Sequence, residues 1–119
     1  MEDTIKNKLI EAGINVDSAM ERFLDDEEMY FEFLNQFPED DLMGRLNNAV
    51  DNNRIKEAFD TAHTLKGVCA NLSIDSMNKI INPMVEILRD NSIDGVPETL
   101  AELFKVYERV LAAINECCK

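Results

Sequence analysis

Apolar residues recur at intervals of three and four residues along most of this chain, and this spacing limits the possible folds more than any other feature. Such spacing gathers the apolar side chains on one face of an α-helix, whereas a half-buried strand needs strict alternation. Only four glycines and three prolines interrupt the 119 residues. A hydrophobic fraction of 45% over this length is enough for one core. The sequence therefore predicts a single all-α domain over residues 1–119.

Residues typical of turns, such as Gly13, separate seven segments that show this periodicity. We expect one helix in each segment: 3–12, 16–24, 27–37, 42–50, 54–72, 75–90 and 97–117. Pro38 either kinks the third helix or opens a new one, and Pro83 is expected to bend the sixth.

Short loops between long helices force neighbouring helices to run antiparallel. The expected architecture is an antiparallel up-and-down four-helix bundle over residues 27–118, with short N-terminal helices over residues 1–24 as a cover. Because such a bundle closes on itself, we expect a monomer. The clearest apolar seam consists of Ile55, Ala58, Ala62, Leu65, Cys69 and Leu72.

The charge of the chain excludes several classes of partner. There are 24 acidic and 12 basic residues, a net charge of −12, and no basic run. A nucleic-acid binder needs a basic face to neutralise phosphates, and an anionic membrane surface attracts basic segments. No apolar stretch reaches the ~18 residues of a membrane span, and the N-terminus has no signal-peptide pattern. We therefore expect a cytoplasmic protein that binds neither nucleic acid nor membrane.

The three cysteines, Cys69, Cys117 and Cys118, do not indicate a disulfide framework, because their number is odd and no secretion signal is present. A structural zinc site needs about four ligands. This chain has one histidine, no C-x-x-C pair and no Glu-x-x-His pair, so no metal site is expected. Cys69 falls on the apolar seam and is expected to be a small core residue.

The single histidine, His63, lies in the middle of the clearest helix but next to its seam, so its ring can reach solvent. Lys66 and Gly67 lie one turn further along the same face, and Ala70 continues it. Glycine in mid-helix costs ~1 kcal/mol relative to alanine. Gly67 either lets another helix pack closely or leaves room for an approaching group.

These residue types are suited to phosphoryl transfer. A neutral imidazole nitrogen is a nucleophile near pH 7. A phosphoryl group on His63 would add about two negative charges, which Lys66 and Lys56 could offset locally. A lone histidine on a helix is most often an ordinary surface residue, so the hypothesis depends on the combination of His63, Lys66 and Gly67.

The run Ala62-His63-Thr64-Leu65-Lys66-Gly67, continuing to Ala70-Asn71-Leu72, resembles the signature of histidine-containing phosphotransfer (HPt) domains. The resemblance implies a four-helix bundle in which His63 is the phosphoacceptor, Lys66 steadies the phosphoryl group and Gly67 leaves room for it. It also implies a carrier without ATP site or cofactor of its own. The phosphoryl group would pass between aspartates of response-regulator receiver domains, which supply Mg²⁺, and a hybrid sensor kinase is a further candidate partner.

Other assignments from the resemblance concern the surroundings of His63. Members of the family often have glycine where this chain has Ser73, so the turn there is expected to differ. Many members hold the second ring nitrogen through a polar residue of the next helix, for which Asn82 and Glu86 are the candidates.

A docking surface for the partner would need apolar groups near His63. Its candidate residues are Lys56, Phe59, Ala70 and Phe31. Phe31 is included because it is out of phase with the stripe of Tyr30, Phe33 and Phe37, which are expected in the core.

Two other functions remain open at this point. The chain could be a helical adaptor that docks receiver domains without being phosphorylated, and His63→Gln would then leave partner function unchanged. It could also be part of an enzyme, such as the amino-terminal piece of a chemotaxis-type kinase or a phosphatase. No Gly-rich phosphate-binding motif is present, which argues against catalysis by this chain alone.

Overall fold

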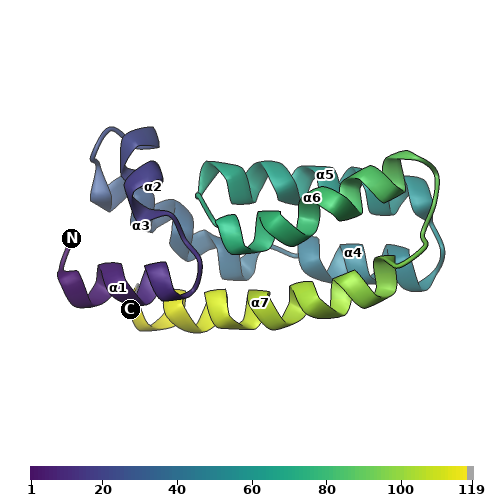
Figure 1. Cartoon of the computed structure of the whole chain (residues 1–119). Coiled ribbons are helices and arrows are strands. Elements are labelled where there is room, and N and C mark those ends of the chain that lie inside the picture. The colour runs from purple at the N-terminus through teal and green to yellow at the C-terminus, as the bar shows by residue number, and fades with distance from the viewer. Residues whose placement is uncertain (118–119) are drawn as a thin grey trace.

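The computed structural model describes residues 1–117, and every element of secondary structure in this range is a helix (Figure 1). The all-α prediction is therefore confirmed. Cys118, the last residue of the predicted bundle, lies outside the described residues. The elements are α1 (Asp3–Glu11), α2 (Val16–Arg22), α3 (Glu27–Gln36), the short 3-10 helix η1 (Phe37–Glu39), α4 (Leu42–Asp51), α5 (Ile55–Asn71), α6 (Asp75–Arg89) and α7 (Val96–Cys117).

Helices α4 to α7 form the antiparallel four-helix bundle, in which α5 packs against α4 and α6, and α7 lies against α6 and α4 (Figure 1). The molecule is elongated, with extents of 43 × 23 × 20 Å, because α7 continues past the bundle. Helix α1 lies along this continuation, where the Nζ of Lys8 is 3.1 Å from the Oε2 of Glu116. The N-terminal helices therefore extend the bundle at one end.

Pro38 separates two helices. Helix α3 ends at Gln36, Pro38 lies within η1, and α4 begins only at Leu42. The backbone N–H of Leu42 donates to Oδ1 of Asp40 at 3.0 Å, which satisfies one of the unpaired donors at the start of α4. Of the two alternatives predicted for Pro38, a kink in the third helix or the opening of a new helix, the structure shows the second. Helix α6, by contrast, continues through Pro83.

The predicted seam of α5 faces the core: Ala58, Ala62, Leu65, Cys69 and Leu72 are buried, and Ile55 is partly buried. Tyr30 of α3 is also buried, and its hydroxyl donates a 2.9 Å hydrogen bond to the carbonyl of Leu72. This bond joins the N-terminal helices to the end of α5. The prediction that Cys69 is a core residue is confirmed.

The aromatic residues on the flanks of α3 differ from expectation. Phe33, predicted in the core, is 50% exposed, whereas Phe31, predicted at the surface, is partly buried against the core. Both predictions are wrong for the same reason. The two residues flank the buried stripe of Tyr30 and Leu34 on opposite sides. Which flank becomes covered depends on the neighbouring helix, and periodicity does not specify that neighbour.

The loop between α1 and α2 is hydrogen-bonded to the turn between α5 and α6. The N–H of Asn15 donates to the carbonyl of Ser73 at 2.9 Å, and the N–H of Ser76 donates to the carbonyl of Gly13 at 3.0 Å. The hydroxyl of Ser76 also donates to the carbonyl of Ala12 at 2.8 Å. These bonds make the N-terminal helices an integral part of the fold and hold the end of α5 in place.

Ser73 occupies a backbone conformation that favours glycine. It is buried, its φ is +58°, and its hydroxyl lies 3.3 Å from that of Ser18. A non-glycine residue in this left-handed region costs roughly 1–2 kcal/mol. We expect the free energy of unfolding of the Ser73→Gly variant to be about 1 kcal/mol higher than that of Ser73→Ala. Both variants lose the hydroxyl, but only glycine relieves the backbone strain. Urea denaturation measures this difference, and equal stabilities would contradict a strained turn.

Candidate functional site

His63 lies on the outer face of α5, away from the buried seam. Its side chain is exposed, and its ring forms no hydrogen bond with any residue of the described part of the chain. Neither ring nitrogen is thus occupied by a hydrogen bond within residues 1–117. The prediction of an exposed histidine beside the seam is confirmed.

The ring of Phe59 lies next to His63, one turn earlier on α5. The two ring centroids are 5.8 Å apart and the planes are inclined by 34°. Arg89, from the last turn of α6, places its guanidinium carbon 5.2 Å from the centroid of Phe59. A guanidinium over an aromatic face is favourable by roughly 0.5–1 kcal/mol at an exposed site. The structure therefore places a cation of the neighbouring helix on Phe59, the ring that lies beside His63.

Sequence reasoning did not assign Arg89 to the site. The residue is 26 positions after His63, and only the antiparallel packing of α5 against α6 brings it near. No local pattern carries that information. Nε of Arg89 also lies 3.5 Å from Oε2 of Glu86, and both side chains are more than half exposed. Such an exposed pair is weak, so Arg89 can change partners at little cost.

Lys66 is partly buried and forms no ion pair with residues 1–117. Its backbone carbonyl accepts a 3.2 Å hydrogen bond from Nδ2 of Asn78 on α6. The buried Oδ1 of Asn78 has no protein partner in the described range. Asn78 thus holds the turn of α5 that carries Lys66 against α6, a second contact that the sequence did not reveal.

Gly67 is exposed, and a Cβ atom built on it would meet no atom within 4 Å outside its own helix. Close packing of another helix against this glycine is therefore excluded. A mid-helix glycine costs ~1 kcal/mol relative to alanine, and no packing contact within the described structure requires a glycine here. The bare backbone next to His63 is thus open to an external group.

The remaining candidates lie around this centre. Asn82 and Glu86 are exposed, and neither forms a hydrogen bond with His63 within residues 1–117, so their role as ring partners stays a prediction. Lys56 is exposed two turns before His63, and Ala70 is partly buried two turns after it. Phe31 lies on α3 and packs against Tyr30 with ring centroids 5.9 Å apart.

The charge around His63 differs from that of the rest of the chain. Residues 54–90, which contain α5 and α6, carry five basic and five acidic side chains, whereas the whole chain has a net charge of −12. The segment that holds His63 is therefore neutral, and the excess negative charge lies elsewhere. A phosphoryl group on His63 meets less electrostatic repulsion here than it would on the acidic helices.

The two described cysteines are weaker candidates for a nucleophile. Cys69 is buried, and burial raises the pKa of its thiol to about 12. Burial also raises the pKa of the Cys117 thiol. Because both pKa values are raised, both thiols remain protonated at neutral pH. The thiolate is the reactive form of cysteine, so neither group is a strong nucleophile. The exposed imidazole of His63 is nucleophilic under the same conditions.

Within residues 1–117, no three histidine, cysteine, aspartate or glutamate side chains gather in a way that could hold a metal ion. The helices of this range also include none with the length and apolar character needed to cross a bilayer.

Comparison with known proteins gave one match. A family model described as "Hpt domain" matches residues 19–113, which include α3 to α6 and most of α2 and α7. No curated protein and no solved structure matched the chain.

Proposed function

This chain belongs to the Hpt domain family, and we propose that it carries a phosphoryl group on His63 between receiver domains of a cytoplasmic phosphorelay. Hpt domains serve histidine phosphotransfer in phosphorelays, working with receiver domains and kinases. The observation that carries the proposal is the exposed ring of His63, which forms no hydrogen bond within residues 1–117, with Lys66 and the bare backbone of Gly67 one turn away.

The bonds that change in the transfer step involve the histidine of this chain and the aspartyl phosphate of the partner. A neutral ring nitrogen of His63 attacks phosphorus with its lone pair, and an N–P bond forms while the P–O bond to the aspartate breaks. The aspartate leaves as a carboxylate with the bonding electrons, and the proton on the other ring nitrogen passes to solvent. The reverse sequence delivers the phosphoryl group to the next aspartate.

The residues around His63 each have a distinct part in this proposal. Lys66 and Arg89 supply positive charge to the phosphoryl oxygens, with Arg89 leaving its weak pair with Glu86. Gly67 leaves space for the phosphoryl group and the partner's active site. The packing of α5 against α6 presents the ring rigidly, which is the main contribution of a carrier to the reaction rate.

The chain acts as a carrier, and the partner completes the reaction centre. We expect the receiver domain to supply Mg²⁺ and its own acidic pocket, while this chain uses no cofactor and works as a monomer. Transfer through a hybrid sensor kinase follows the same chemistry, because such a kinase would present its phosphoryl group on a receiver aspartate.

The test is phosphoryl transfer from a labelled receiver domain to the wild-type chain and to His63→Gln. We expect acid-labile, base-stable label on the wild type and none on the variant, because glutamine has no nucleophilic nitrogen. Circular dichroism serves as the folding control for the exposed substitution. If a broad receiver panel fails to label a folded wild type yet still binds it, the chain is a docking module without chemistry.

A further inference from the structure

The side-chain amide of Asn78 joins α6 to α5 in the turn that follows His63. Its Nδ2 donates a 3.2 Å hydrogen bond to the backbone carbonyl of Lys66, in a partly buried position. That carbonyl belongs to the peptide group between Lys66 and Gly67. In an α-helix the N–H of this peptide group donates to the carbonyl four residues before Gly67, which is that of His63. One side chain of α6 thus holds a peptide group that connects the backbones of His63, Lys66 and Gly67.

The turn of α5 around His63 contains two features that weaken a helix. Gly67 has no side chain to restrict its backbone, and among the amino acids only proline is less favourable inside a helix. The hydroxyl of Thr64 donates to the carbonyl of Asp60 at 2.9 Å, and such a bond to the preceding turn slightly destabilises and often bends a helix. This turn therefore depends on contacts from outside α5 to keep a fixed shape.

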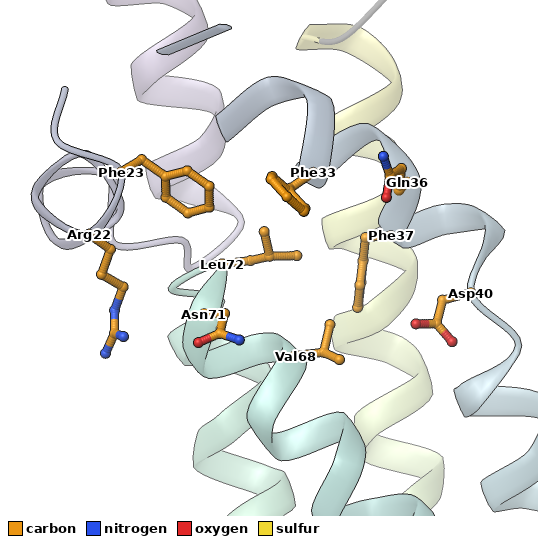
Figure 2. A pocket seen from close by; sticks show the side chains of 9 residues that line it. All are labelled: Arg22, Phe23, Phe33, Gln36, Phe37, Asp40, Val68, Asn71 and Leu72. Carbon is orange, nitrogen blue, oxygen red and sulfur yellow. The ribbon is translucent and has the colours of Figure 1, made fainter. Parts of the chain in front are cut away.

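The two flanks of this turn are supported differently. Val68, two residues after Lys66, lies roughly 200° round the helix axis from it, at about 100° per residue. Val68 and Asn71 line a hollow of about 500 Å³, whose other wall includes Phe33 of α3 (Figure 2). The flank toward α6 is held by Asn78, whereas the opposite flank borders this hollow.

The composition of the Asn78 side chain does not favour stability. Its Oδ1 is the one buried side-chain nitrogen or oxygen of residues 1–117 without a hydrogen-bond partner in the protein. An apolar side chain of similar size would leave no buried acceptor to satisfy, and such a replacement is often neutral or stabilising. An asparagine at this position is therefore explained by its donor group, which binds the carbonyl of Lys66.

Two contacts from α6 reach α5 on either side of His63. Arg89 lies over Phe59, four residues before His63, and Asn78 binds the carbonyl of Lys66, three residues after it. The side chain of Arg89 is more than half exposed and exchanges partners at little cost. Asn78 is partly buried and binds the main chain, so it is the fixed contact of the two.

We infer that Asn78 is a positioning residue for phosphoryl transfer, because it holds Lys66 where its ammonium group meets the phosphoryl oxygens on His63. The inference rests on the proposed phosphotransfer. Asn78 acts through the backbone of Lys66 and touches neither the phosphoryl group nor the partner. Its loss should therefore slow the chemical step and leave the affinity for the receiver domain unchanged.

The first test compares Asn78→Leu with Ser76→Ala in single-turnover transfer from a labelled receiver domain. Leucine is close to asparagine in size and has neither the donor nor the unpaired acceptor. Ser76 is the matched control, since it lies two residues earlier on α6, is partly buried, and donates to the backbone carbonyl of Ala12 at 2.8 Å. We expect Asn78→Leu to lower the maximal rate about tenfold at an unchanged half-saturating receiver concentration. Ser76→Ala should keep both values.

The second test shows whether Asn78 acts through Lys66. A double-mutant cycle combines Asn78→Leu with Lys66→Met, which nearly keeps the length of the side chain and removes its charge. Without the ammonium group, the position of residue 66 no longer affects the phosphoryl group. Asn78→Leu should therefore change the rate of the Lys66→Met protein by less than about twofold. A merely structural loss would slow both proteins by the same factor.

Potassium phosphoramidate, a small phosphoryl donor that needs no docking, separates failure of this inference from failure of the proposed function. Because Lys66 meets the phosphoryl oxygens from either donor, Asn78→Leu should slow phosphoramidate labelling of His63 by a similar factor. Wild-type rates in Asn78→Leu, a loss with the receiver alone, or an equal loss in Ser76→Ala overturns the positioning role and leaves the carrier role intact. So does an undiminished loss in the Lys66→Met protein. No label on His63 of the wild type from either donor overturns both.

Discussion

Gly67→Ala is expected to stabilise the protein and to impair it as a phosphoryl acceptor. Alanine at a mid-helix position is more favourable than glycine by roughly 0.5–1 kcal/mol, and the added Cβ meets no atom within 4 Å. The same methyl group occupies the space beside His63 that the partner's active site must enter. A displacement of about 1 Å in the reacting geometry can cost 10²-fold in rate. We therefore expect transfer to slow by roughly 10- to 100-fold.

Gly44→Ala is the matched control for this experiment. Gly44 is also an exposed helical glycine, in α4, and an added Cβ there meets no atom within 4 Å. It should gain stability without loss of transfer. Urea unfolding and single-turnover transfer from a receiver domain measure the two effects. If Gly67→Ala transferred at the wild-type rate, steric access would not be the reason for this glycine.

Gly13→Ala is expected to destabilise the fold more than the same substitution at any other glycine of the chain. Gly13 has a φ of +87°, and its added Cβ would lie 2.2 Å from Cβ of Ser76. The clash must displace a residue that forms hydrogen bonds with the carbonyls of Ala12 and Gly13. Backbone strain and two weakened hydrogen bonds together cost about 3–4 kcal/mol. Thermal unfolding should shift down by more than about 10 °C.

The Gly95→Ala variant separates the two causes of this loss of stability, which are the strained backbone conformation and the steric clash with Ser76. Its φ is +77°, but an added Cβ meets no atom within 4 Å. Gly95→Ala should therefore lose only the cost of the backbone conformation, about 1 kcal/mol. A similar loss in both variants would mean that Ser76 moves aside easily, and that the contact of the α1–α2 loop with the α5–α6 turn contributes little to stability.

Two features of the HPt signature have a physical explanation in the structure. The glycine expected in the family at the position of Ser73 corresponds to a left-handed φ of +58° in this chain. Gly67 lies on an open surface instead of a helix interface. Both explanations depend on the three-dimensional environment of one residue, which the order of residues along the chain does not contain.

The sequence by itself determined the helices, their buried faces and the outward position of His63. These properties are local, because 3.6 residues per turn fix which side chains share a face whatever the helix packs against. The seam of α5 and the position of His63 beside it followed from this period alone. The end of α1 before Gly13 and the start of α7 next to Pro97 followed from the backbone preferences of glycine and proline, which are also local.

Only the tertiary structure decided which groups from different helices meet. Three features all require the register between helices: Arg89 over Phe59, Asn78 on the carbonyl of Lys66, and the hollow lined by Phe33. That register depends on how side chains interlock across an interface, and the period of one helix does not contain it. For the same reason the predicted exposed and covered flanks of α3 are reversed in the structure. The period of a helix specifies which residues form its apolar face, but the neighbouring helices determine how much of the adjoining surface becomes buried.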